Sequence, residues 1–143
     1  MKGKIKIFTD GGSRGNPGPA AAGVVIKDQV DTVLHEYSQC LGETTNGQAE
    51  YQAIIFGLKK AKSLKYKKAD VYLDSQFIVE QLNGNYKIKN EGIIPLFIQA
   101  WNLRLDFEQI SFNFVPREQN READKLVNQA LDQQKKVNKI PGL

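Results

Sequence analysis

The chain has 143 residues, of which 41% are apolar and 25% charged, so it is about one folded domain long and is not a disordered protein. One cysteine (Cys40) and one histidine (His35) exclude an intramolecular disulfide and zinc sites of several Cys and His ligands, so metal chemistry here must be carboxylate chemistry. A net charge of +4 is compatible with a polyanionic partner but does not require one.

Hydrophobic periodicity predicts nine elements. In chain order these are strands over 4–9, 20–27 and 32–41, a helix over 48–64, a strand over 70–73, helices over 76–82 and 92–105, a strand over 109–115 and a helix over 120–134. Four glycines and two prolines predict a loop over residues 11–19. Pro95 falls in the first turn of its helix, where proline is tolerated.

This order of elements indicates a single α/β domain over residues 1–134, with a polar C-terminal tail over residues 135–143 that we expect to fray. Three successive strands with short connections favour an antiparallel meander. The strand–helix–strand stretches favour parallel pairs. We therefore expect a five-stranded mixed sheet, three strands antiparallel and two parallel, flanked by helices.

Two further expectations concern the location of the chain. Its start shows no secretory signal and no stretch approaches the ~20 apolar residues that span a bilayer, so a cytoplasmic protein without membrane contact is expected. Length and the polar tail favour a free-standing protein over a domain of a longer polypeptide.

Four acidic residues occupy positions where a charge is costly. Asp10 directly follows the first apolar strand, and Asp74 follows a second one. Glu50 extends the buried stripe of the long helix, and Asp124 lies in the first turn of the last helix. Each has an ordinary explanation: a turn residue or N-cap, a salt bridge to a lysine, or a favourable contact with the helix dipole. If they converge at one sheet edge, they repel one another, and a bound Mg²⁺ or Mn²⁺ relieves the repulsion.

Four segments, in this order and spacing, resemble ribonuclease HI. They are TDGGSRGNPGPAAAG, TTNGQAEYQAI, YLDSQFIVEQL and VPREQNREADKLVNQAL, and the match extends over about residues 4–134. Together they are highly specific, although each alone is weak. The resemblance implies the ribonuclease H-like fold.

The resemblance also implies the site residues. The family's acidic quartet falls on Asp10, Glu50, Asp74 and Asp124 and would bind two Mg²⁺ ions, for which Mn²⁺ may substitute. Minor-groove and phosphate contacts would come from a further set: Gly11, Ser13, Asn16, Thr45, Asn46, Gln76 and Asn90. Without the resemblance, ordinary turn chemistry is the better explanation of Asn16.

The sequence departs from the family at two places. Arg117 occupies the place where the family often has a mobile histidine, and an arginine cannot act as a general base at neutral pH. The basic handle that many members insert before the final strand is missing, as in short archaeal-like members. Arg117 is therefore expected in the catalytic set as a phosphate- or product-handling group.

The implied function is an endoribonuclease, expected to be monomeric, that hydrolyses the RNA strand of RNA–DNA hybrids by two-metal catalysis. Its products would have 5′-phosphate and 3′-hydroxyl ends, and double-stranded RNA is a further possible substrate. A non-catalytic hybrid- or RNA-binding module on the same fold is the alternative, and it predicts loss of an acid. A nucleotide phosphate loop in GGSRGNPG is a third hypothesis, although the P-loop pattern is absent.

Overall fold

A computed structural model describes residues 3–138 and contains the nine predicted elements. The strands are β1 (Ile5–Ser13), β2 (Gly18–Lys27), β3 (Val33–Thr44), β4 (Lys68–Leu73) and β5 (Gln109–Phe114). The helices are α1 (Asn46–Ser63), α2 (Gln76–Leu82), α3 (Ile94–Leu103) and α4 (Arg121–Asn138), with short 3₁₀ turns η1 (Arg104–Asp106) and η2 (Arg117–Gln119).

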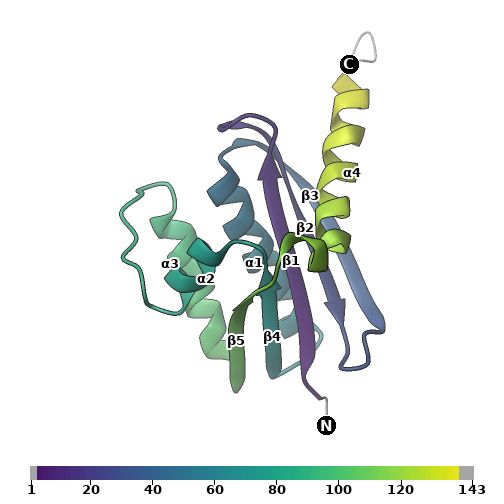
Figure 1. Cartoon of the computed structure of the whole chain (residues 1–143). Helices are drawn as coiled ribbons and strands as arrows, with labels where there is room; N and C mark the ends of the chain where they lie inside the picture. The colour runs from purple at the N-terminus through teal and green to yellow at the C-terminus, as the bar shows by residue number, and fades with distance from the viewer. Residues whose placement is uncertain (1–2, 139–143) are drawn as a thin grey trace.

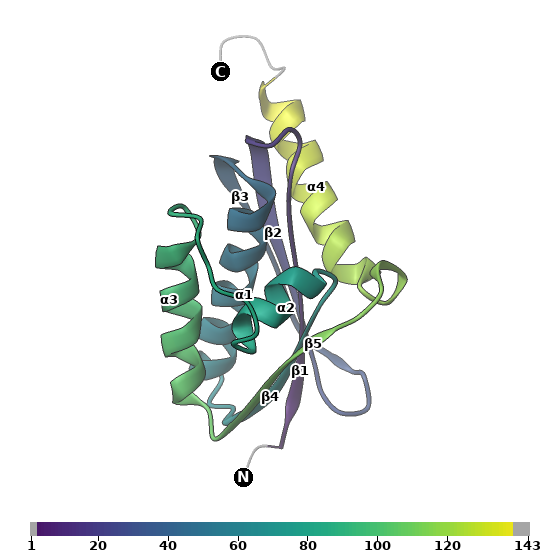
Figure 2. The same cartoon turned by 60° about the vertical axis from the view of Figure 1, so that its left-hand side comes forward.

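The five strands form one mixed sheet in the order β3-β2-β1-β4-β5 (Figure 1). β1, β2 and β3 pair antiparallel, whereas β4 pairs parallel with both β1 and β5. α1 covers one face of the sheet with α3 packed against it, and α4 lies on the other face (Figure 2). The predicted α/β fold class is thus confirmed. No helix within residues 3–138 combines the length and the apolarity needed to cross a bilayer.

The main core lies between the sheet and α1, which buries Tyr51, Ile54 and Leu58. A smaller apolar cluster lies under α4, where Val127 and Leu131 pack on Ala21 of β2. The main cluster holds α1 against β1 and β2, and the smaller one holds α4 against β2 on the opposite face. The site described below lies between these two helices.

The loop prediction over residues 11–19 is wrong at both ends. β1 continues through Ser13 and β2 starts at Gly18, so that Gly11 pairs with Ala22 and Ser13 with Ala20. Glycine disfavours strands because it has no side chain to pack, but here the missing side chains let helices approach the ladder closely. Asp10 is therefore inside β1 and not at its end.

The last helix also differs from the expectation. α4 runs to Asn138, past the predicted end at residue 134, so part of the expected tail is helical. The remainder of that tail, residues 139–143, lies outside the described residues.

Candidate active site

The four acidic side chains converge where the parallel pairing of β1 and β4 stops. The last parallel pair is Phe8 with Tyr72, and Asp10 and Asp74 each lie two residues beyond it. Both line a cleft of about 390 Å³, together with Glu50 and Asp124. The structure thus brings together the quartet expected from the sequence.

Glu50 reaches the cleft because α1 packs unusually close to β1. A Cβ at Gly11 would lie 2.2 Å from the carbonyl carbon of Ala49 and 2.4 Å from the backbone nitrogen of Glu50. Real Cβ atoms do not approach so closely, so only glycine permits this contact. Gly11, expected from the resemblance to contact substrate, therefore has a structural role in placing Glu50 beside Asp10.

Asp124 comes from the opposite face of the sheet by the same device. Gly23 is the cross-strand partner of Asp10, and a Cβ there would lie 2.5 Å from the carbonyl oxygen of Ala123. The first turn of α4 therefore rests directly on the ladder. Asp124 is placed next to Asp10, close enough for its charge to raise the pKa of Asp10.

Burial and mutual repulsion hold a proton on this cluster. The pKa of Asp10 is raised to about 8, and burial is the largest cause. The charges of the neighbouring acids Asp74, Asp124 and Glu50 raise it further. Burial raises the pKa of Glu50 to about 7, opposed by a hydrogen bond from Ser75 and increased by the charge of Asp74. A site with such pKa values at neutral pH favours a cation among its carboxylates.

The donor set fits a hard divalent cation, because carboxylate oxygens are the ligands that Mg²⁺ and Mn²⁺ prefer. Within residues 3–138 no three Asp, Glu, His or Cys side chains are already arranged so that they could hold an ion. The four acids line the cleft without closing on a common point, so the fit rests on their chemistry and repulsion.

Arg117 brings a positive charge to this cleft. It lies in η2, and its guanidinium Nη2 is 3.8 Å from Oδ1 of Asp124. Its side chain is 82% exposed, compared with 32% for Asp124. The guanidinium is therefore free to move toward a ligand.

Asn120 is a residue of this site that the sequence analysis missed. It is 1% exposed, and its Nδ2 donates to the carbonyl oxygen of Thr9 (2.9 Å) and to Oδ2 of Asp74 (3.3 Å). In the sequence it appears only as an asparagine at a helix start, a common N-cap residue. A buried position for so polar a residue becomes visible only in the fold.

Three of the expected substrate-binding residues form one hydrogen-bonded network beside the acids. Oδ1 of Asn46 accepts from the backbone nitrogen (2.8 Å) and the hydroxyl (3.0 Å) of Ser13. The backbone nitrogen of Asn46 donates to Oδ1 of Asn16 (3.1 Å). Both side-chain oxygens are thus occupied, and the amide NH₂ groups are the parts left for a ligand.

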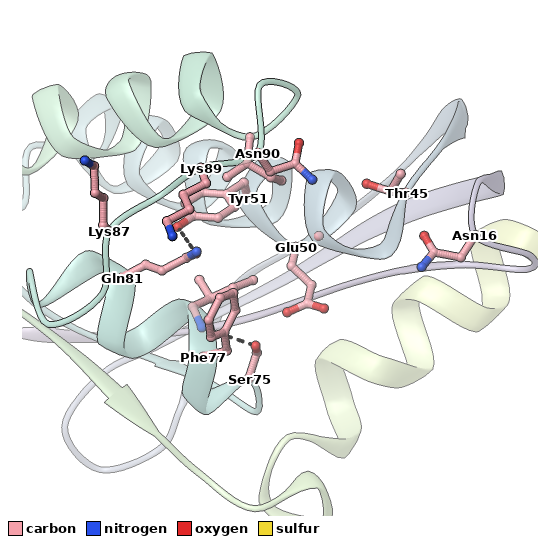
Figure 3. A pocket seen from close by; sticks show the side chains of 13 residues that line it. Asn16, Thr45, Glu50, Tyr51, Ser75, Phe77, Gln81, Lys87, Lys89 and Asn90 are labelled. Atoms are coloured by element: carbon pink, nitrogen blue, oxygen red, sulfur yellow. Dashed lines mark hydrogen bonds between the residues drawn. The ribbon is translucent and has the colours of Figure 1, made fainter.

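A second cavity, of about 550 Å³, adjoins the cleft and shares Glu50 with it. Figure 3 shows Glu50 between Thr45 on one side and Lys87 and Lys89 on the other. Asn90 also lines this cavity, and its Oδ1 accepts from the backbone nitrogen of Gly92 (2.8 Å).

Thr45 has a second role, as the N-cap of α1. Its hydroxyl accepts from the backbone nitrogen of Gln48 (3.2 Å), and the Gln48 side chain accepts in return from the Thr45 backbone, a capping box. Gln76 opens α2 and is exposed, and it lines neither cavity. Its neighbours Ser75 and Phe77 line the second one.

Comparison with known proteins gives similarity over most of the chain. Residues 8–130 match the model of a protein family described as reverse transcriptase-like. A bifunctional protein of Mycobacterium tuberculosis is 44% identical over 90% of this chain and 36% of its own length. Ribonuclease HI of Halobacterium salinarum is 36% identical over 91% of this chain and 65% of its own. The chain thus spans about a third of the mycobacterial relative and just under two thirds of the archaeal one.

Solved structures agree with these relatives. The N-terminal RNase H domain of the mycobacterial protein superposes with a TM-score of 0.87 at 43% identity, covering 90% of this chain and 99% of that one. RNase H1 of Halobacterium salinarum gives a TM-score of 0.89 at 36% identity, covering 92% and 99%. LC11-RNase H1, isolated from compost and solved in complex with an RNA/DNA hybrid, gives 0.86 at 42%, covering 90% and 97%.

Proposed function

The chain belongs to the ribonuclease H family, as a short RNase H1-type domain, and from this we propose that it is an endonuclease that hydrolyses the RNA strand of RNA–DNA hybrids. The products carry 5′-phosphate and 3′-hydroxyl ends. The observation that carries the proposal is the convergence of Asp10, Glu50, Asp74 and Asp124 in one cleft beside a network of side-chain amides.

The four carboxylates would hold two divalent ions, Mg²⁺ or Mn²⁺. When bound, such a pair lowers the pKa of an attacking water and stabilises the leaving 3′-oxygen of a phosphodiester. Asp10 would be the central ligand of the set, because the charges of the other three acids all act on it. Its place inside the central strand β1 keeps it rigid.

The amide network suits the minor groove of a hybrid. Asn16 and Asn46 have NH₂ donors to offer, and minor-groove base edges and the RNA 2′-oxygen are acceptors. Ser13 fixes the orientation of Asn46 mainly through its backbone nitrogen, because its single hydroxyl hydrogen is shared with the carbonyl oxygen of Gly15. The arrangement recognises groove shape and the 2′-hydroxyl, without selecting a base sequence.

The adjoining cavity would take the backbone of the DNA strand. Thr45 and Asn90 supply neutral hydrogen-bonding groups to a phosphate there, and Lys87 and Lys89 supply positive charge. These two lysines stand in the short segment that replaces the basic handle of other members. Gln76 contacts the groove from the exposed start of α2.

Arg117 assists at the phosphate or at product release. Its exposed guanidinium beside Asp124 stabilises negative charge at the scissile group. An arginine does not act as a general base at neutral pH. It therefore does not accept a proton during the reaction.

The experiment is cleavage of end-labelled RNA/DNA, RNA/RNA and DNA–RNA–DNA/DNA duplexes in Mg²⁺, Mn²⁺ or EDTA. We expect metal-dependent cutting of RNA in the hybrids, with 5′-phosphate ends on the products. Cutting of RNA/RNA as well would extend the substrate class to double-stranded RNA. If the protein binds the hybrid but cuts it with neither metal, the result would indicate a non-catalytic binding module instead of an enzyme.

A further inference from the structure

Asn120 contacts three parts of the acidic site from one buried position. Its Nδ2 donates to the carbonyl oxygen of Thr9, the residue that precedes Asp10, and to the carboxylate of Asp74. Its backbone oxygen accepts from the nitrogen of Asp124 (3.1 Å) at the start of α4. One residue thus bonds to β1, to the acid that follows β4 and to the helix that carries the fourth acid.

The geometry requires an amide at this position. Both groups that face Nδ2 are acceptors, and a single NH₂ supplies one hydrogen to each. A carboxylate of the same size would place acceptors against acceptors, and an apolar side chain would leave the Thr9 carbonyl and the Asp74 carboxylate without a donor. A hydroxyl has one hydrogen and satisfies one of the two.

The burial of Asn120 points in the same direction. The residue is 1% exposed, and no described residue provides a hydrogen-bond partner for its Oδ1. Burying an amide with its oxygen unpaired is unfavourable, so an apolar residue of similar size would be the better choice if the position only had to be filled. The advantage of asparagine over an apolar residue is that its NH₂ group donates two hydrogen bonds.

We propose that Asn120 is a positioning residue for metal binding: its side-chain amide sets the separation of Asp10 and Asp74. The backbone bond to Asp124 is the ordinary first hydrogen bond of α4 and does not depend on the side chain. Glu50 lies outside this set, since it comes from α1. Groups that orient metal ligands in this way commonly contribute about 10–100-fold to metal affinity or activity. The inference rests on the proposed function where it is tested by hybrid cleavage. Its second test, the affinity for Mn²⁺ without substrate, does not depend on that function.

The test compares the wild type with Asn120→Leu, Asn120→Ser and a control, Asn113→Leu. Asn113 makes a chemically similar bond, since its Nδ2 donates to the carbonyl oxygen of Val71 (3.2 Å) between β5 and β4, but touches no acid of the cleft. Mn²⁺ affinity is measured by electron paramagnetic resonance titration without substrate. Hybrid cleavage then gives kcat and KM, and urea unfolding gives stability.

For Asn120→Leu we expect Mn²⁺ binding weaker by about 10–100-fold, kcat lower by a similar factor and KM for the hybrid within about twofold of the wild type. Asn120→Ser should fall between, and it decides the matter if Asn120→Leu does not fold. Asn113→Leu should lose stability with unchanged Mn²⁺ affinity and kcat.

If the role of Asn120 is purely structural, both leucine variants lose stability but keep the Mn²⁺ affinity and kcat of the wild type. That result would overturn the inference. If the wild type cleaves no duplex, the proposed function fails, while the Mn²⁺ titration still decides the role of Asn120.

Discussion

Gly23 lies directly beneath the backbone of α4: a Cβ added to it would be 2.5 Å from the carbonyl oxygen of Ala123 and 3.1 Å from Cβ of Leu126. Because Gly23 is also the cross-strand partner of Asp10, the missing side chain sets how closely Asp124 approaches Asp10. Gly11 has the same relationship to α1 on the other face, where it admits Glu50. Glu50 and Asp124 meet at β1 because Gly11 and Gly23 leave room for the backbones of α1 and α4.

Gly23→Ala tests this relationship. The added methyl must push α4 away from β2, so we expect a loss of unfolding free energy of about 1–3 kcal/mol. Asp124 moves with the helix, and kcat should fall more than KM changes. Gly12→Ala is the stability control, because its Cβ would meet only Cγ1 of Val127, at 3.7 Å. Equal stabilities of the two variants in urea would contradict the close contact.

Stability should depend on pH in a direction that the raised carboxyl pKa values determine. The pKa of Asp10 is about 8 and that of Glu50 about 7 in the folded protein, compared with roughly 4 for unfolded carboxyls. The folded state therefore binds more protons between about pH 4 and pH 8, and the free energy of unfolding falls as pH rises through that window. Urea titrations in EDTA at pH 5 and pH 8 measure this. Mg²⁺ should restore stability at pH 8, and equal stability at both pH values without it would contradict the prediction.

Asp10→Asn should abolish metal-dependent cleavage while leaving hybrid binding largely intact. It also removes a buried charge that Asp74, Asp124 and Glu50 repel, so in EDTA at pH 8 the variant should be more stable than the wild type. Cleavage, binding by fluorescence anisotropy and urea unfolding are measured on one preparation. Turnover near the wild-type level would refute the assignment of Asp10.

Arg117→Ala should reduce kcat modestly, by about 2–10-fold if about 0.5–1.4 kcal/mol of charge stabilisation is lost. Stability should change by less than about 1 kcal/mol, because Arg117 is exposed and its ion pair with Asp124 is long. Arg117→Lys keeps the charge and should recover part of the rate. A fully inactive Arg117→Ala would instead indicate a direct catalytic role.

Lys87→Ala and Lys89→Ala should each weaken hybrid binding and lower the slope of log affinity against log salt by about one. Lys62→Ala is the matched control, since Lys62 lies in the last turn of α1 and pairs with Asp106 (2.9 Å). Anisotropy at several salt concentrations gives the slopes. An unchanged slope in both lysine variants would show that Lys87 and Lys89 do not contact the hybrid.

Local patterns account for the elements that were predicted well. The helix at Gln76–Leu82 was predicted to the residue, because Ser75 caps it and its apolar residues are closely spaced. The proline in the first turn of α3 also lies where its missing N–H costs nothing. The run of glycines after Asp10 misled the prediction, because a glycine in a tightly covered strand and a glycine in a loop look alike without the packing partner.

Periodicity and residue types at fixed spacing were enough to predict the α/β class, the chain order of the elements, and the four acids with their family resemblance. The approach of Glu50 and Asp124 to Asp10 past Gly11 and Gly23 is visible only in the folded chain, as is the burial of Asn120 between Thr9 and Asp74. Those contacts join residues up to 111 positions apart in the chain. Their geometry depends on how closely helices pack on the sheet, which local sequence patterns do not encode.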